Sequence, residues 1–311
     1  MRVLIVGATG VVGRPLVRLL SQGHEVLGTT RSEGKTAALR ELGAEPLVCD
    51  AHDAASLRRA VLAAKPEVIV NQLTDLSKPL NPRRYTEWVE PTNRLRIEST
   101  RVLTAAAVEV GARLLVSQSI AFAYRQDGTA LKTEQDPLYV GAPGGFDAAV
   151  AAVLELEQRT LDTPGLEGIV LRYGYFYGPE TSYAHDGQIA DMVRRRQFPV
   201  VGPGSGRFSF IHVDDAAAAT LAAIERGQQG VYNIVDDEPA EMRDWLPLYA
   251  AAVGAKKPRR VPRWLARIVA GRFMADNAVE LRGASNEKAK RELGWQPRWT
   301  SYAAGFRDAL G

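Results

Sequence analysis

The chain reads VLIVGATGVVG from Val3 to Gly13, and this stretch decides the fold. A mostly β-branched run leads into three glycines, and apolar residues then recur at helical spacing as far as Leu20. Between a strand and a helix, the first glycine permits a tight turn, the second lets the backbone approach a pyrophosphate, and the third allows close helix packing. The helix N-terminus adds free N–H groups. A tight turn alone is the simpler alternative, but the position of the stretch favours a dinucleotide site at Gly7, Thr9, Gly10, Val11, Val12 and Gly13.

Strands and helices alternate along the first 235 residues. This alternation predicts right-handed βαβ units and an α/β fold of Rossmann type, with a doubly wound parallel sheet covered on both faces. A further strand at 208–213 is expected to return to that sheet. The expected strands are 3–6, 25–29, 45–48, 67–71, 113–117, 168–172 and 231–235, and the expected helices are 11–20, 35–42, 54–64, 92–110, 146–161 and 214–225.

Two domains are expected. Residues 1–174 plus 206–235 form the dinucleotide-binding domain, and 175–205 plus 236–311 form a small, mostly helical substrate domain over the carboxyl edge of the sheet. The segment 256–272 carries seven basic and no acidic residues. We expect its helix to place apolar residues on the core and arginines in water, although contact with an anionic lipid surface or an acidic substrate is an alternative.

Composition excludes several classes of protein. The chain has 311 residues, 46% hydrophobic and 24% charged, with a net charge of +3, which is typical of a globular protein and not of a nucleic-acid-binding polycation. Cys49 is the only cysteine, so an intrachain disulfide or a cysteine-built zinc site is excluded. Apolar runs are too short for a signal peptide or a membrane span, so a cytoplasmic protein without a membrane partner is expected.

The end of the second strand separates NAD from NADP. It reads Gly28-Thr-Thr-Arg31-Ser32, without the acidic residue that would bind a free ribose 2′-hydroxyl. Arg31 can fork onto phosphate oxygens and Ser32 can add a hydroxyl, so NADP is expected in preference to NAD. Asp50 follows the third strand and either meets the adenine ring or caps the next helix.

Several motifs occur in the order found in one family. GATGVVG at 7–13, Cys49-Asp50, LLVSQS at 114–119, LRYGYFYGP at 171–179, FIHVDD at 210–215 and VYNI at 231–234 resemble the short-chain dehydrogenase/reductase superfamily, in its extended or atypical NAD-dependent epimerase/dehydratase branch. The likeness covers nearly the whole chain. It implies further cofactor contacts at Ala51, Leu73, Ser117 and Tyr173.

The catalytic part of the family pattern fits less well. The resemblance implies a serine after the fifth strand, which is Ser119, and a Tyr-x-x-x-Lys pair that transfers the proton on the next helix. Phe146 and Val150 stand at those two positions, and no Tyr-x-x-x-Lys occurs in the chain. Arg96 occupies the place of the family's helix-four asparagine. The substitute proton donors considered are Tyr124 and Tyr139 first, and then Tyr175, Tyr177, Asp147 and His185.

Other features are assigned to the substrate or to the framework. Phe146, Tyr175 and His185 are expected to contact the substrate. Arg207 resembles the arginine that meets a substrate diphosphate in nucleotide-sugar epimerases. His212 and Asp214 are expected to be structural, with Asp214 capping the following helix, and no metal site is expected.

These observations favour an NADP-dependent reductase, epimerase or dehydratase that acts on a carbonyl or hydroxyl of a small metabolite, with an unusual proton donor. Two alternatives remain: a non-catalytic NADP-binding regulator or scaffold, and a cofactor-assisted isomerase or cyclase. The helices at 92–110 and 146–161 are also expected to pair two subunits into a homodimer.

Overall fold

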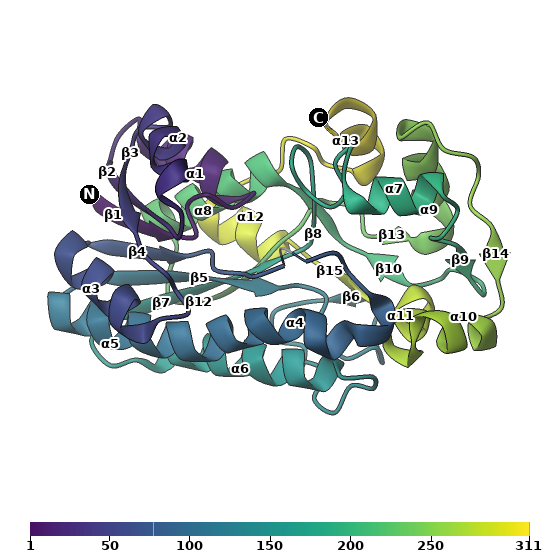
Figure 1. The fold of residues 1–311 in the computed structure, drawn as a ribbon. Coiled ribbons are helices and arrows are strands. Elements are labelled where there is room, and N and C mark those ends of the chain that lie inside the picture. Colours follow the sequence, from purple (N-terminus) through teal and green to yellow (C-terminus); the bar gives the residue numbers. More distant parts are fainter. Residues whose placement is uncertain (77, 311) are drawn as a thin grey trace.

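The computed structural model describes residues 1–76 and 78–310 and shows the expected α/β fold. Within these residues, seven parallel strands form a central sheet in the order β12-β7-β5-β4-β1-β2-β3 (Figure 1). The chain crosses over between β1 and β4, and open α/β sheets bind ligands at such a switch point. The strands are β1 (Arg2–Val6), β2 (Glu25–Thr30), β3 (Ala44–Val48), β4 (Val68–Asn71), β5 (Leu114–Ile120), β7 (Glu167–Tyr173) and β12 (Gly230–Ile234).

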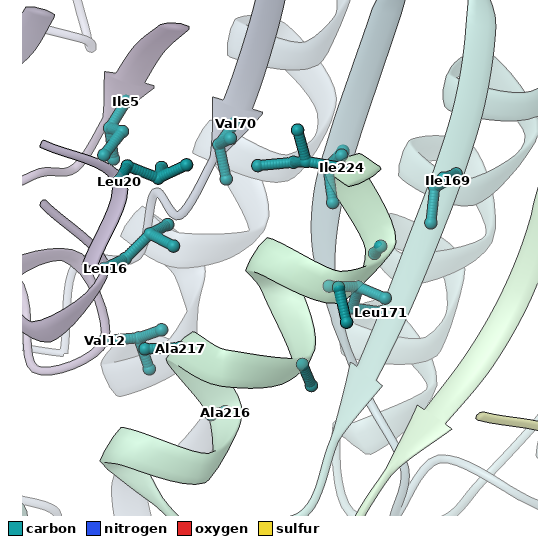
Figure 2. Close-up of a cluster of buried hydrophobic side chains, with 14 of the residues drawn as sticks. Ile5, Val12, Leu16, Leu20, Val70, Ile169, Leu171, Ala216, Ala217 and Ile224 are labelled. Carbon is teal, nitrogen blue, oxygen red and sulfur yellow. The ribbon is translucent and has the colours of Figure 1, made fainter. Parts of the chain in front are cut away.

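Helices cover both faces of the sheet, which explains the continuous apolar runs in its strands. One face carries α1 (Gly13–Leu20), α2 (Thr36–Glu41), α8 (Val213–Arg226) and α12 (Glu287–Leu293), and the other carries α3 (Ala54–Ala64), α5 (Thr100–Val110) and α6 (Phe146–Asp162) (Figure 1). Figure 2 shows Leu16 and Leu20 of α1 packed beside Ile5 and Val70 of the sheet. The alanine-rich α8 fits the same core because its small side chains permit a close approach.

The helix expected at 92–110 begins earlier and changes its winding. It starts as α4 (Tyr85–Arg94), passes through a π-helical turn at Leu95–Ser99, and continues as α5. A π-helical turn is rare, and it often occurs at functional sites. Here it includes Arg96, which is buried.

A second hydrophobic core is rich in aromatic residues. Buried Phe210, Trp245, Tyr249 and Phe306 form its centre. Its elements are β8 (Tyr175–Tyr177), α7 (Gln188–Arg194), β9 (Val200–Val201), β10 (Arg207–Phe208), β11 (Phe210–His212), β13 (Ala240–Glu241), α9 (Met242–Ala252), β14 (Arg260–Val261), α10 (Arg263–Ala270), α11 (Arg272–Glu280) and α13 (Tyr302–Asp308). A short pair of β6 (Leu131–Lys132) and β15 (Gly283–Ala284) lies beside it.

Two expectations about the chain path are corrected. The strand expected at 208–213 does not enter the central sheet, because β10 pairs with β13 and β11 pairs with β8. In addition, α12 packs against α8 and β12, and buried Ala289, Leu293 and Trp295 join the core of the cofactor domain. Helix α12 and Trp295, which lie in the segment assigned to the substrate domain, therefore pack into the core beside the central sheet.

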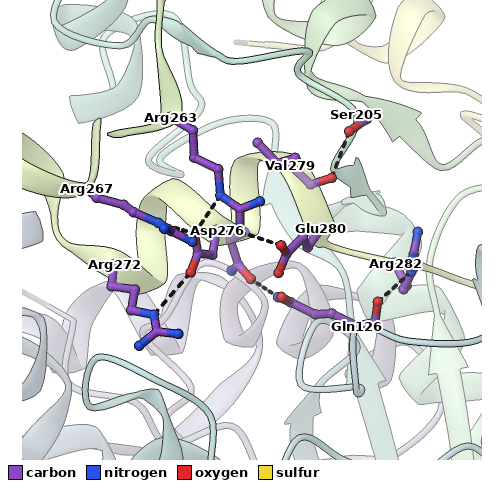
Figure 3. Close-up of polar contacts among 10 residues, drawn as sticks. Gln126, Ser205, Arg263, Arg267, Arg272, Asp276, Val279, Glu280 and Arg282 are labelled. Atoms are coloured by element: carbon purple, nitrogen blue, oxygen red, sulfur yellow. Dashed lines mark hydrogen bonds and ion pairs between the residues drawn. The ribbon is translucent and has the colours of Figure 1, made fainter. Parts of the chain in front are cut away.

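The orientation expected for α10 is wrong. Its apolar residues face outward, with Trp264 65% exposed and Ile268 67% exposed. Its arginines are partly exposed and bond to a buried carboxylate: Arg263 and Arg267 each donate to Oδ1 of Asp276 at 2.8 Å (Figure 3). The ion pairs hold this helix in place, whereas apolar packing was expected to do so.

Two helix caps also differ from expectation. His212 caps α8, since its Nδ1 accepts the Asp214 N–H at 3.2 Å, and Asp214 itself stands in the first turn. Asp53, and not Asp50, caps α3 by accepting the Ala55 N–H at 2.9 Å.

Within residues 1–76 and 78–310, every helix is too short or too polar to cross a membrane. The same residues contain no group of three or more His, Cys, Asp or Glu side chains that could hold a metal ion.

Candidate active site

A cleft of about 1090 Å³ runs from the glycine loop, over the carboxyl ends of the central strands, to α10 and α11. Gly10, Val11, Val12 and Gly13 line one end. Aromatic and aliphatic side chains of both domains line the rest, so the cleft is polar at the cofactor end and apolar beyond it. These include Tyr85, Trp88, Phe122, Tyr175, Phe208, Leu265, Val269 and Phe273.

The glycine loop has the geometry that its sequence predicts. Gly7 has a positive φ of 92°, and a Cβ there would lie 2.7 Å from the Gln72 carbonyl oxygen. A Cβ on Gly13 would lie 2.3 Å from the Gly7 carbonyl oxygen. The N-terminus of α1 lies at the cleft, where Val12 and Gly13 line the wall. No side chain caps this end, so its first N–H groups stay open to a ligand. This end of the cleft fits the pyrophosphate of a nicotinamide dinucleotide.

Arg31 lies at the same end of the cleft, at the tip of β2. Its Nη1 stands 3.5 Å from Oδ2 of Asp75, and His52 Nε2 approaches the same oxygen at 3.2 Å. The arginine side chain is largely exposed, so an incoming phosphate can compete for it. Beside it, the Ser32 N–H donates to the Thr30 hydroxyl at 3.2 Å.

The other expected cofactor residues lie near this end but do not line the cleft, with one exception. Asp50 accepts the His52 N–H at 3.0 Å, the Ala51 carbonyl accepts the Ser99 hydroxyl at 2.9 Å, and the Leu73 N–H donates to Asn71 at 3.2 Å. Ser117 is fully buried and accepts the Thr160 hydroxyl at 2.9 Å. Tyr173 lines the cleft, while its hydroxyl bonds to Gln72 and Thr220.

The positions of the missing Tyr and Lys are closed off from the cleft. Phe146 opens α6 and stacks on Phe273 with ring centroids 4.1 Å apart, and Val150 is fully buried. Ser119 does line the cleft, and its hydroxyl donates to Glu157 at 2.6 Å. Arg172 holds the same carboxylate through bonds of 2.8 and 2.6 Å. The serine is thus oriented by a buried ion pair.

The two tyrosines first considered as proton donors lie elsewhere. The buried Tyr124 hydroxyl donates to Asn233 at 2.7 Å and accepts from Arg172 at 2.8 Å, away from the cleft. Burial raises the pKa of Tyr124 to about 12 even though the Arg172 charge lowers it. Tyr139 packs at the edge of the core around Phe146 and does not line the cleft either.

Only one of the remaining candidates reaches the cleft. Tyr175 lines it and stacks on Phe122 with centroids 4.3 Å apart. Tyr177 is buried in the aromatic core around Phe210, and exposed Asp147 stands on α6. His185 lies 3.2 Å from Arg194, and Arg207 faces Glu241 at 3.5 Å. Within the described residues, none of these four lines the cleft.

Two site residues were not assigned a role from the sequence. Tyr85, at the start of α4, and Arg96, in the π-helical turn, both line the cleft. Arg96 is only 8% exposed and donates to Asn93 Oδ1 at 3.2 Å. The signal for Arg96 was its position, where the family has an asparagine. Tyr85 lies outside the expected helix and gave no signal.

Comparison with known proteins places these features in context. The model of the NAD dependent epimerase/dehydratase family matches residues 3–235. A 3-diazoavenalumate denitrifying reductase from Streptomyces sp is 44% identical over 315 residues, covering 100% of this chain and 99% of that protein. A 4-hydroxy-2-methyl-3-oxo-4-farnesyl-3,4-dihydroquinoline-1-oxide ketoreductase from Stigmatella aurantiaca is 28% identical and covers 96% of this chain and 93% of that protein.

Solved structures share the fold. The human epimerase family protein SDR39U1 with NADPH has a TM-score of 0.75 and 23% identity, covering 100% of this chain and 99% of that one. The UDP-glucose 4-epimerase of Thermotoga maritima with UDP-glucose has a TM-score of 0.74 and 22% identity. The match covers 100% of this chain and 97% of that one.

Proposed function

The chain belongs to the NAD-dependent epimerase/dehydratase family and is an oxidoreductase, and from this premise we propose that it is an NADPH-dependent denitrifying reductase. Its substrate would be an aromatic acid that carries a diazo group. The proposal rests on one observation. Phe146 and Val150 occupy the positions of the family's Tyr and Lys, and both are buried side chains that cannot donate a proton. The named activity of the 44% identical relative supports it.

The electron balance of this reaction explains why no proton relay is needed. A reduced nicotinamide supplies a hydride when it is bound. In the overall reaction an aryl diazonium ion gains that hydride as a new C–H bond, and the C–N bond breaks with its electron pair leaving on dinitrogen. Charge balances without a proton, whereas reduction of a ketone would require one.

Ser119 suits a cationic group. Because its proton is directed to Glu157, its oxygen lone pairs remain available to the cleft. Arg172 neutralises the Glu157 carboxylate, so the serine stays fixed without adding net charge. We assign Ser119 the role of holding the diazo group by its oxygen.

The aromatic walls support an aromatic substrate. Phe122 and Tyr175 stack on each other, and Tyr85 and Phe273 lie with centroids 5.1 Å apart on the opposite elements α4 and α11. Rings of this kind favour a flat, conjugated molecule through stacking and exclusion of water. NADPH is proposed over NADH because Arg31 lies at the end of β2, where a 2′-phosphate would bind.

The test follows hydrogen isotopes. The purified protein receives NADPH deuterated at nicotinamide C4 and a diazotised aminocinnamate, and the product is examined by mass spectrometry and NMR. We expect one deuterium at the carbon that lost nitrogen and no incorporation from heavy water. The parent amine serves as the control and should consume no NADPH.

Two outcomes would contradict the proposal. Consumption of NADPH with ketones but not with diazo compounds would assign the chain to the ketoreductases. Binding of NADPH with no turnover of either substrate class would support the regulator hypothesis.

A further inference from the structure

Arg96 is a buried cation that faces the cleft. The π-helical turn places it there, and its guanidinium has one described hydrogen bond, to the neutral Asn93 side chain. Burial lowers the pKa of Arg96 to about 10, which still leaves it charged at neutral pH. A buried charge is costly unless it is paired. The part of the chain that the structure describes provides no carboxylate bonded to it.

The carboxylate that interacts with Arg96 is already engaged. Glu157 attracts Arg96 electrostatically, yet it accepts two bonds from Arg172 and one from Ser119. Arg172 and Glu157 therefore cancel each other, and Arg96 is left with an unmatched positive charge.

Two phenol groups extend this donor set. Tyr85, Tyr175 and Arg96 all line the same cleft, and the charge of Arg96 lowers the pKa that burial raises at Tyr85. Neither hydroxyl has a hydrogen-bond partner among residues 1–76 and 78–310. Burial raises the pKa of both phenols, so each remains protonated and can donate.

We propose that Arg96, Tyr85 and Tyr175 form a subsite for an anionic oxygen of the substrate, a carboxylate or a phenolate carried by an aromatic body. The inference rests on the proposed function, since it concerns the same cleft and substrate. Arg96 supplies the charge and the two phenols supply further hydrogen bonds. The subsite anchors the molecule in the cleft that Ser119 also lines.

Binding of unreactive probes tests the subsite without turnover. With NADP⁺ present, titration calorimetry measures the binding of cinnamate and of neutral cinnamamide to the native protein and to Arg96→Gln. A second pair, 4-nitrophenol at mildly alkaline pH and 4-nitroanisole, distinguishes a phenolate from a carboxylate. Arg94→Gln is the matched control, because Arg94 lies on the same helix but pairs with Glu98 at the surface.

We expect Arg96→Gln to weaken at least one anionic probe by about tenfold or more, and to leave its neutral partner within about twofold. Arg96→Lys should restore part of that affinity, and Arg94→Gln should leave it unchanged. Equal weakening of the anionic and neutral probes would overturn the proposal, as would no weakening. A comparable loss of NADP⁺ affinity in Arg96→Gln would assign the arginine to the cofactor instead.

These outcomes are independent of the proposed reaction. If anionic probes bind through Arg96 but the diazo substrate is not reduced, the subsite stands and the denitrifying activity fails. If the diazo substrate is reduced equally well by Arg96→Gln and the anionic probes bind it normally, the activity stands and the subsite fails.

Discussion

Arg31 at the tip of β2 carries the expected preference for NADP. Its ion pair with Asp75, at 3.5 Å, is long and the arginine side chain is largely exposed, so a 2′-phosphate can replace this pair at little cost. We expect Arg31→Ala to weaken NADPH binding by about tenfold or more and NADH binding by less than about twofold, as measured by cofactor fluorescence. Arg40→Ala, on exposed α2, is the control. An equal loss for both cofactors would refute the assignment.

At the scale of single residues, the backbone geometry of the glycine loop was easier to predict from the sequence than the positions of the side chains at the other end of the cleft. Gly7 and Gly13 could be predicted because a Cβ at either position would clash with backbone oxygen atoms. Tyr124 was a misleading candidate, since its proximity to Ser119 along the chain says nothing of the Asn233 side chain that accepts its proton. The burial of Arg96 depends on one residue of extra winding in a helix, which a periodic pattern does not reveal.

Among the elements, α10 and α11 are joined by a cluster of ion pairs centred on one carboxylate. Asp276 is 7% exposed and pairs with Arg263, Arg267 and Arg272 (Figure 3). We expect Asp276→Asn to lower the free energy of unfolding by about 1–2 kcal/mol at neutral pH, measured by urea denaturation. Asp191→Asn, which removes an exposed ion pair with Arg195, should have almost no effect.

The same carboxylate makes the contribution of α10 and α11 to the free energy of unfolding depend on pH. Burial alone would raise the pKa of Asp276, but hydrogen bonds from Arg267 and Arg263 outweigh it and lower the pKa. A depressed folded-state pKa stabilises the protein above the unfolded value of about 3.9, and this contribution is lost as the pH falls through the folded pKa. The difference in stability between native protein and Asp276→Asn should therefore shrink below about pH 4. A difference that stays constant with pH would contradict this account.

The elements themselves were predicted unevenly, for a physical reason. All seven central strands were predicted, and the inner strands β1 and β4 show why: burial on both faces imposes continuous apolar runs. The strand at 208–213 was assigned to the wrong sheet. Its partner β8 lies 35 residues earlier and is short, so the residues around 208–213 do not indicate which strand they pair with. The orientation of α10 was predicted from the usual rule that apolar faces point inward. In the structure Trp264 and Ile268 face solvent, and arginine ion pairs attach the helix.

For the whole molecule, pairing of two subunits through α5 and α6 stays a prediction. These helices lie side by side on one face (Figure 1), and their outer surface exposes Val108, Ala148 and Ala151. We expect light scattering to show a dimer that Ala151→Arg converts to a monomer. Ala63→Arg, on the exposed side of α3, is the control. A native protein that is monomeric at all concentrations would exclude this interface.

The inverted helix α10 has an evolutionary consequence. Because arginine pairs with Asp276 anchor it, its apolar positions are free of the packing constraints that restrict a core. Leu265 and Val269 line the mouth of the cleft, and Trp264 and Ile268 lie beside them at the surface. Related chains can therefore diverge at these four positions, and so in the molecules they admit, without a compensating change in the rest of the fold.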